Sequence, residues 1–173
     1  AIKTHSESNA PLLLLGERGT GKEYIAQAIH QKSSKNNLPF LRINCASRQM
    51  NEIAPFLFPK KKNRPANKSL SLKKKSTASP SRVIFLDNVD SLTKTMQEKL
   101  IDSLSPDENG KKNTLPSRLY ISTSKCLEEL SKQNQFNFNL LKLFDDATIQ
   151  VPPLRKNPSN IAILIHGHLE KKS

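Results

Sequence analysis

Tryptophan is absent from the 173 residues of this chain, and aromatic residues make up only 5% of them. So few aromatic side chains argue against a surface on which the bases of single-stranded nucleic acid stack. No apolar run approaches the roughly 20 residues that span a bilayer, and the chain does not open with a signal-peptide pattern. We therefore expect a cytoplasmic domain that makes no membrane contact.

Cysteine and glycine are also scarce. The two cysteines, Cys45 and Cys126, are too few for a disulfide framework, and we expect both to be small buried residues. Three of the five glycines lie between positions 16 and 21. A chain of this length with 35% apolar residues can bury one core, so a single α/β domain is the natural expectation.

Acidic residues are missing from one stretch, which carries most of the net charge of +13. Between Lys60 and Arg82 there are nine basic residues; without them, 19 basic residues stand against 15 acidic ones. Three prolines and several serines and asparagines in residues 59–82 predict an irregular, disordered insertion. The alternative is a loop that binds the phosphates of DNA or RNA, which the lack of interleaved aromatics disfavours.

The glycines belong to the stretch around which the rest of the chain is arranged, Gly16-Glu17-Arg18-Gly19-Thr20-Gly21-Lys22-Glu23. It follows an apolar run, Leu12 to Leu15, and opens into an amphipathic segment, Glu23 to Lys32. A strand, a glycine loop and a helix in this order are typical of a phosphate-binding loop rather than a simple turn. Positive φ values at the glycines would turn successive N–H groups toward one anion, and Lys22 adds a full charge. We predict that residues 16–23 bind ATP or ADP.

A second nucleotide signal is the apolar run Val83 to Leu86, which ends in Asp87. In a parallel sheet this carboxylate emerges at the edge where the glycine loop also emerges. There Asp87 can hold Mg²⁺, directly or through water, opposite the phosphates on Lys22. An acid near a strand end can instead cap a helix, a role open to Asp90.

The residue after Asp87 bears on hydrolysis. Many P-loop ATPases carry a glutamate at this position, which orients or deprotonates the attacking water, but here it is Asn88. An amide can hold a water by hydrogen bonds, but it cannot take its proton near neutral pH. Asn88 therefore favours nucleotide binding over turnover.

Apolar runs predict five strands, at residues 11–15, 40–44, 83–86, 119–122 and 148–151. Helices are expected between and after them, at residues 23–32, 47–58, 96–104 and 126–133 and from residue 159 onward. Strands that alternate with helices in this way predict an α/β fold, a five-stranded parallel sheet with helices on both faces.

Further short stretches accompany the glycine loop: Ile25-Ala26-Gln27-Ala28-Ile29-His30, Pro39-Phe40, Ile43-Asn44-Cys45-Ala46, Leu57-Phe58, Phe85-Leu86-Asp87, Gln97 with Lys99-Leu100, and Pro152-Pro153-Leu154-Arg155 with Ile161. With them, the chain resembles the central AAA+ ATPase domain of bacterial enhancer-binding proteins, the sigma-54 interaction domain of NtrC-type transcriptional regulators. The resemblance covers nearly all of residues 10–165, and a glutamate at position 23 is usual in this family. It implies a P-loop AAA+ fold with residues 1–9 as a linker, 10–155 as the nucleotide-binding α/β subdomain and 156–173 as the start of a truncated helical lid.

Several residues that the family uses for sigma-factor contact, nucleotide sensing and hydrolysis are replaced in this chain. The family's Gly-Ala-Phe-Thr-Gly-Ala motif for the sigma factor falls on residues 63–68, where neither its phenylalanine nor its threonine is present. The polar sensor at the end of the fourth strand, usually asparagine, falls on Ser124. The two arginines that reach a neighbouring subunit's nucleotide fall near Asn137 and Leu143, with Lys142 close by. Arg18 also puts a long cation where the family has a small residue.

Together with Asn88, these departures imply a degenerate member that binds nucleotide and hydrolyses it poorly or not at all. The partners that the resemblance implies are RNA polymerase or a sigma factor, DNA through domains outside this chain, and further copies of the chain, from dimer to hexamer. Two alternatives stay open. One is a working AAA+ ATPase that remodels RNA polymerase, with Lys142 in place of an arginine; the other is a nucleic-acid-binding module acting through residues 59–82.

Overall fold

The computed structural model describes residues 10–47, 54, 82–105, 117–145 and 147–156. The expected linker 1–9, nearly all of the expected helix 47–58 and of the basic insertion 59–82, and the expected lid beyond residue 156 lie outside the described residues. The predictions made for those segments stay predictions. Among the described residues, no helix combines the length and the apolar character needed to cross a membrane.

The described part of the chain is built on a parallel sheet of five strands. The strands are β1 (Leu12–Leu15), β2 (Phe40–Asn44), β3 (Val83–Asp87), β4 (Arg118–Thr123) and β5 (Thr148–Gln150), in the spatial order β2-β3-β4-β1-β5. The predicted five-stranded parallel sheet is confirmed, and each predicted strand end differs from the observed one by at most one residue. The strands could be predicted from apolar runs because both faces of the sheet are covered, so that consecutive side chains on a strand are buried.

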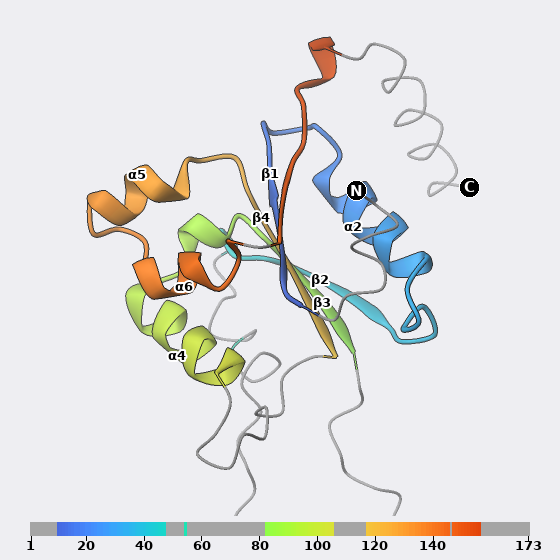
Figure 1. The fold of residues 1–173 in the computed structure, drawn as a ribbon, viewed down its shortest axis with the longest axis horizontal. Helices are drawn as coiled ribbons and strands as arrows, with labels where there is room; N and C mark the ends of the chain where they lie inside the picture. The colour runs from blue at the N-terminus through green and yellow to red at the C-terminus, as the bar shows by residue number, and fades with distance from the viewer. Residues whose placement is uncertain (1–9, 48–53, 55–81, 106–116, 146, 157–173) are drawn as a thin grey trace, which may run out of the picture.

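Helices cover both faces of the sheet, as predicted (Figure 1). The described helical segments are α2 (Lys22–Gln31), η1 (Val89–Ser91), α4 (Lys94–Leu104), α5 (Leu127–Lys132), α6 (Phe138–Lys142) and η2 (Leu154–Lys156). The sequence did not predict α6, because its five residues are too few to display a helical period. Asn137 caps it by accepting a hydrogen bond from the Asn139 N–H at 2.9 Å.

Alternation along the strands divides the core into two clusters. One cluster joins the sheet to α4, α5 and α6 and includes Leu13, Ile84, Ile121, Leu100, Leu127 and Leu140. The other joins the opposite face of the sheet to α2 and includes Leu12, Leu14, Phe85, Ala26 and Ile29. Asp87 and Ser122 continue the alternation of the second cluster, so their side chains belong to the face that α2 covers.

The two cysteines differ in environment. Cys45 is buried as expected, and its pKa is raised to about 12 by burial and by the nearby carboxylates of Asp87 and Asp90. Its thiol therefore stays protonated and unreactive at neutral pH. Cys126 is exposed, contrary to the expectation, because it lies at the surface immediately before α5, with Sγ 3.1 Å from Glu128 Oε2.

A buried carboxylate fixes the segment after β3 to the end of β4. The Asp90 side chain is only 5% exposed; it accepts a hydrogen bond from Thr123 Oγ1 at 2.7 Å and pairs with Lys125 Nζ at 2.9 Å. Burial by itself raises the pKa of Asp90, but the hydrogen bonds from Lys125 and Thr123 outweigh it, so the pKa lies below its usual value. Asp90 thus connects the segment after β3 to the end of β4 through a hydrogen bond and an ion pair.

Replacing Asp90 by asparagine removes the charge that both donors bind, and we expect it to lower the free energy of unfolding by about 1–3 kcal/mol at pH 7. Because the folded-state pKa is depressed, the contribution of this carboxylate is complete above the unfolded-state pKa of about 3.9. It is lost as the pH falls through the lower folded-state pKa. Urea unfolding followed by circular dichroism should therefore show the stability difference between wild type and Asp90→Asn shrinking at acid pH.

The matched control is Asp145→Asn, which removes an exposed carboxylate and should change the free energy of unfolding by no more than about 0.5 kcal/mol. A difference between wild type and Asp90→Asn that stays constant from neutral to acid pH would contradict this assignment.

Candidate functional site

The glycine loop, residues 16–23, leads from β1 into α2 with two glycines in the left-handed region. Gly19 has φ 78° and Gly21 has φ 80°. Gly21 is also the N-cap of α2, and no side chain caps that helix. A helix N-terminus without a side-chain cap is the arrangement that favours an anion at that end of the helix.

Gly16 is required for a different reason from the one predicted. Its φ is not positive; instead, a Cβ atom built on it would lie 2.8 Å from the Val151 carbonyl oxygen and 3.0 Å from Val151 Cβ. The contact is with backbone that cannot easily move, because the Val151 N–H donates to the Leu15 carbonyl at 2.7 Å. Gly16 thus lets the loop leave β1 close against the chain that follows β5.

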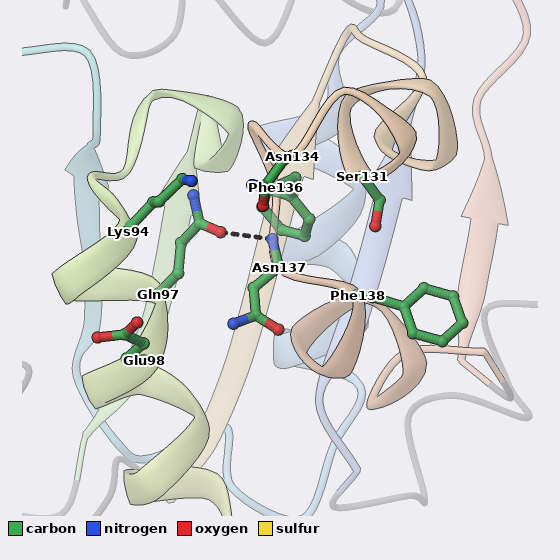
Figure 2. A pocket seen from close by; sticks show the side chains of 8 residues that line it. All are labelled: Lys94, Gln97, Glu98, Ser131, Asn134, Phe136, Asn137 and Phe138. Carbon is green, nitrogen blue, oxygen red and sulfur yellow. Dashed lines mark hydrogen bonds between the residues drawn. The ribbon is translucent and has the colours of Figure 1, made fainter.

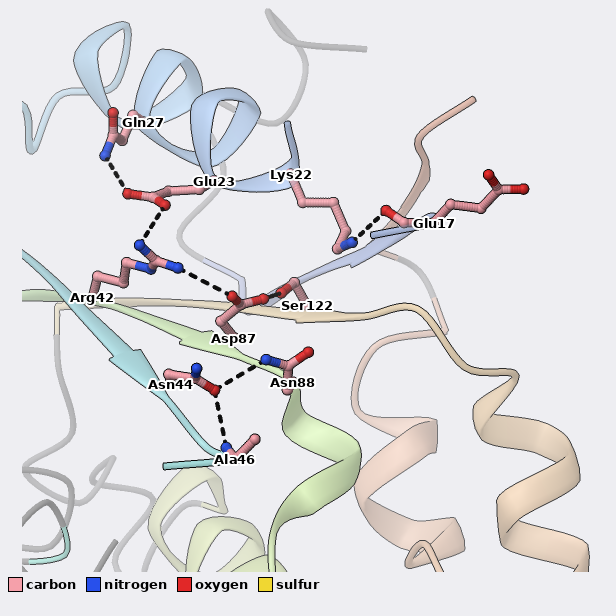
Figure 3. A network of polar contacts seen from close by, with 10 residues as sticks. All are labelled: Glu17, Lys22, Glu23, Gln27, Arg42, Asn44, Ala46, Asp87, Asn88 and Ser122. Atoms are coloured by element: carbon pink, nitrogen blue, oxygen red, sulfur yellow. Dashed lines mark hydrogen bonds and ion pairs between the residues drawn. The ribbon is translucent and has the colours of Figure 1, made fainter. Parts of the chain in front are cut away.

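Lys22 turns back over the loop that precedes it (Figure 3). Its Nζ donates to the carbonyl oxygens of Gly16 at 2.8 Å and Glu17 at 2.9 Å. Burial lowers the pKa of Lys22, the Asp87 carboxylate raises it, and the exposed Arg18 lowers it. The net pKa lies below the usual lysine value. The ammonium is thereby fixed at the loop, at the end of the sheet where β3 also ends.

Arg155, in η2, holds the tip of the loop from the far end of the chain. Its guanidinium donates twice to Glu17, Nη1 to Oε2 at 2.6 Å and Nη2 to Oε1 at 2.8 Å. This hydrogen-bonded pair lowers the pKa of Glu17 and raises that of Arg155. Thr20 Oγ1 also donates to the Glu17 carbonyl at 2.8 Å, so the loop is braced from inside as well. Arg155 entered the family resemblance, but nothing in the sequence pointed to its partner.

Asp87, the predicted magnesium ligand, lies beside the loop with both carboxylate oxygens in use. Oδ1 accepts from Ser122 Oγ at 2.5 Å, and Oδ2 lies 3.4 Å from Arg42 Nη2. Arg42 Nη1 reaches Glu23 Oε2 at 3.1 Å, so one guanidinium bridges the two acids (Figure 3). Arg42 and Ser122 belong to no sequence motif; strand alternation on neighbouring parallel strands is the signal that could have indicated them.

Asn88 lies next to Asp87 in the left-handed conformation, with φ 56°, which asparagine tolerates better than most residues. Its Nδ2 donates to Asn44 Oδ1 at 3.0 Å, and the same oxygen accepts the Ala46 N–H at 3.0 Å. The amide is thereby tied to the end of β2. It has no group that can accept a proton from water near neutral pH.

The other predicted positions are spread around the end of β4 and around α6. Ser124 is exposed immediately after β4. Asn137 is used structurally, because its side chain caps α6 and its N–H donates to the buried Gln97 Oε1 at 2.7 Å. Leu143 is 39% exposed, and Lys142 Nζ lies 4.8 Å from the centre of the Phe138 ring.

A cavity of about 300 Å³ lies between α4 and the α5–α6 segment rather than at the glycine loop (Figure 2). It is lined by Lys94, Gln97, Glu98, Ser131, Asn134, Phe136, Asn137 and Phe138. No residue of the glycine loop contributes to it. Its polar lining includes the hydrogen bond between Gln97 and the Asn137 N–H, which holds α6 against α4.

The two loop glycines give a prediction that separates steric contact from backbone strain. Gly16→Ala should lower the free energy of unfolding by about 1–3 kcal/mol through overpacking against Val151. Gly19→Ala should cost about 1–2 kcal/mol through its positive φ, since a Cβ at Gly19 meets nothing within 4 Å.

Asparagine distinguishes the two causes. Gly19→Asn should be milder than Gly19→Ala because asparagine tolerates the left-handed region, whereas Gly16→Asn should be worse than Gly16→Ala because its side chain is larger. Urea unfolding of the four variants is the measurement. The same order of alanine and asparagine at both positions would refute this distinction.

Comparison with known proteins gives the family. A family model described as the Sigma-54 interaction domain matches residues 1–150. The Nif-specific regulatory protein of Azorhizobium caulinodans is 31% identical over 171 residues, which cover 96% of this chain and 28% of that protein. The DNA-binding transcriptional activator HyfR of Escherichia coli is 29% identical over 96% of this chain and 26% of its own length. This chain spans less than a third of the length of these two relatives.

Solved structures also share the fold. NtrX from Brucella abortus, solved in complex with ATP, superposes with a TM-score of 0.72 at 24% identity, covering 98% of this chain and 39% of that one. The P-loop NTPase domain of a sigma-54 transport activator from E. coli superposes with a TM-score of 0.62 at 19% identity, covering 88% and 90% of the two chains. Since the family match extends over most of the chain and the superpositions cover 98% and 88% of it, this protein belongs to the Sigma-54 interaction domain family and has a P-loop AAA+ fold.

Proposed function

We propose that this chain is the nucleotide-binding regulatory domain of a bacterial transcription regulator, and that it binds ATP or ADP with little or no hydrolysis. The observation that carries the proposal is the geometry of the glycine loop. Gly19 and Gly21 have positive φ, the uncapped N-terminus of α2 follows, and Lys22 is held at the loop carbonyls. Backbone N–H groups, a helix N-terminus and an ammonium at one place are what a polyphosphate requires.

The relatives support the same ligand. NtrX from Brucella abortus was solved both with ATP and with ADP, and the two superpositions cover 98% and 95% of this chain. The sigma-54 transport activator domain from E. coli is itself described as a P-loop NTPase domain. Within this chain, residues 16–23 are the segment that would contact the phosphates.

Weak hydrolysis follows from the groups that surround this segment. Asn88 offers an amide where a carboxylate base would be needed, and that amide is already bound to Asn44. Ser124 offers only a hydroxyl at the predicted sensor position. Without a base, the attacking water is not activated, so we expect binding to persist without turnover.

The position of α6 supports the same conclusion for catalysis between subunits. A trans arginine adds about 10³ to 10⁵ in rate where one is present. Asn137 is engaged in capping α6, and Leu143 carries no charge. Lys142 packs over the Phe138 ring of its own helix, so a substitute cation at this place would first have to leave that contact.

Isothermal titration with ATP and with ADP tests the binding half of the proposal. We expect saturable binding to the wild type, and a loss of about 10- to 100-fold in affinity for Lys22→Met, because a charge-assisted hydrogen bond contributes about 1.5–3 kcal/mol. Lys32→Met, which removes an exposed lysine after the end of α2, is the matched control and should bind as the wild type does. Equal affinities for wild type and Lys22→Met would contradict the assignment.

Steady-state measurement of phosphate release tests the proposal that this chain hydrolyses ATP slowly or not at all. We expect turnover well below the value of about one per second that is ordinary for enzymes, and no gain of that size in Asn88→Glu, because the trans arginines are also replaced. Turnover on the order of one per second in the wild type, abolished by Lys22→Met, would instead identify a working ATPase. Restoration by Asn88→Glu alone would show that the missing base is the single obstacle.

The family description names sigma-54 as the partner, and its contact motif is expected at residues 63–68, outside the described residues. Because this stretch lacks the phenylalanine and threonine of the motif, we propose that the chain does not engage sigma-54 through it and acts on RNA polymerase or DNA through other parts of a longer regulator. Gel filtration of the chain with purified sigma-54 and ATP should show no co-migration. A stable complex that is lost when residues 63–68 are replaced would contradict this.

A further inference from the structure

Arg42 occupies the place where a divalent cation would be expected. It is on β2, opposite Phe85 of β3 in the parallel register, and its side chain extends toward α2 along the edge of the sheet (Figure 3). Its Nη1 lies 3.1 Å from Glu23 Oε2, and its Nη2 lies 3.4 Å from Asp87 Oδ2. These partners are the residue that follows Lys22 and the predicted magnesium ligand. One guanidinium therefore connects the start of α2 to the end of β3.

Every oxygen of the two carboxylates has a protein donor. Asp87 Oδ1 accepts from Ser122 at 2.5 Å while Oδ2 pairs with Arg42. Glu23 Oε1 accepts from Gln27 Nε2 at 3.1 Å while Oε2 pairs with Arg42. Each oxygen of these acids thus has one hydrogen-bond or ion-pair partner from within the chain, and their combined negative charge is partly neutralised by the Arg42 guanidinium.

This donor set does not fit Mg²⁺ while Arg42 stays in place. Magnesium needs oxygen ligands at about 2.0–2.1 Å in near-octahedral geometry, and a guanidinium paired with both acids repels the ion. Among the described residues, no group of three or more histidine, cysteine, aspartate or glutamate side chains could hold a metal ion. Arg42 is therefore a cation that competes with Mg²⁺ for the carboxylate of Asp87.

We propose that Arg42 takes the place of the divalent cation, so that this chain binds its nucleotide independently of Mg²⁺. The inference rests on the proposed function, because it assigns the counter-charge of the same site. Nucleotide phosphates carry several negative charges, which a protein must neutralise with a metal ion or with its own cations. Here Lys22 supplies one charge at the loop, and Arg42 supplies another on the side of Asp87.

The exposure of Arg42 fits this role better than a purely structural one. Its side chain is 52% exposed, so the ion pairs it forms contribute little to stability and can reorganise when a ligand arrives. A guanidinium is always charged and binds phosphate oxygens in a planar, two-pronged geometry. Arg42 can therefore exchange part of its contact with Glu23 or Asp87 for a phosphate without leaving the edge of the sheet.

The first test needs no nucleotide and uses Mn²⁺ as the probe. Electron paramagnetic resonance titration of the nucleotide-free chain should detect no bound Mn²⁺ in the wild type and bound Mn²⁺ in Arg42→Met, because removing the guanidinium frees the Asp87 and Glu23 oxygens. Asp87→Asn in the Arg42→Met background should abolish that binding. Arg155→Met, which removes another exposed arginine from a glutamate of the loop, is the matched control and should bind no Mn²⁺.

Arg42→Gln serves as a second variant if Arg42→Met does not fold, as judged by circular dichroism. Wild-type chain that binds Mn²⁺ as tightly as Arg42→Met would overturn the proposal. So would folded Arg42→Met and Arg42→Gln that both fail to bind the ion.

The second test compares ATP affinity in Mg²⁺ and in EDTA by calorimetry. The wild type should bind equally in both, whereas Arg42→Met should bind at least about tenfold more tightly with Mg²⁺ than without it. Wild-type binding that needs Mg²⁺ would overturn the role of Arg42 and leave the proposed function standing. No ATP binding in either buffer would instead defeat the proposed function, and the Mn²⁺ titration would still decide whether Arg42 excludes the ion.

Discussion

Parallel pairing of β1, β3 and β4 is the constraint on which the site depends. Leu15 pairs with Thr123 and Leu86 with Ile121, so the carboxyl ends of the three strands meet at one edge of the sheet. The glycine loop follows β1, and Asp87 ends β3 at that same edge. Two buried clusters on opposite faces hold this register, since a shift by one residue would turn every strand side chain to the wrong face. The packing of the core therefore fixes the strand register, and the register places the polar groups of the site.

Electrostatic pairing then distinguishes this edge from a generic phosphate site. Each acid of the glycine loop has its own arginine, Glu17 with Arg155 and Glu23 with Arg42, and the second arginine also reaches Asp87. Arginine suits such positions because its charge does not depend on pH and its planar fork can bind two oxygens at once. The result is a loop whose counter-charges are built into the chain. The proposed function assigns this site to holding a polyphosphate rather than to activating water beside it.

The sequence could predict those features of the fold and the site that depend on residues close together in the chain. The strands and α2 follow from local apolar runs and from the glycine pattern, so their positions were predicted to within a residue, and the positive φ of Gly19 and Gly21 followed from the same logic. The need for glycine at position 16 comes instead from contact with Val151, far along the chain. The partners Arg42–Asp87, Ser122–Asp87 and Arg155–Glu17 are separated by 45, 35 and 138 residues. The fold brings these partners together, so strand alternation can indicate Arg42 and Ser122 only once the strand pairing is known, and it cannot indicate Arg155, which lies in η2 beyond the sheet.

In the proposed function, the glycine loop binds a nucleotide although the groups that would hydrolyse it are replaced. Calorimetric titration of the wild-type chain with ATP in EDTA tests it most directly, because it removes both metal assistance and turnover from the measurement. We expect saturable binding of one nucleotide per chain, weakened about 10- to 100-fold in Lys22→Met. Absence of binding at millimolar ATP, with or without Mg²⁺, would contradict it and would leave a phosphate-loop scaffold without its ligand.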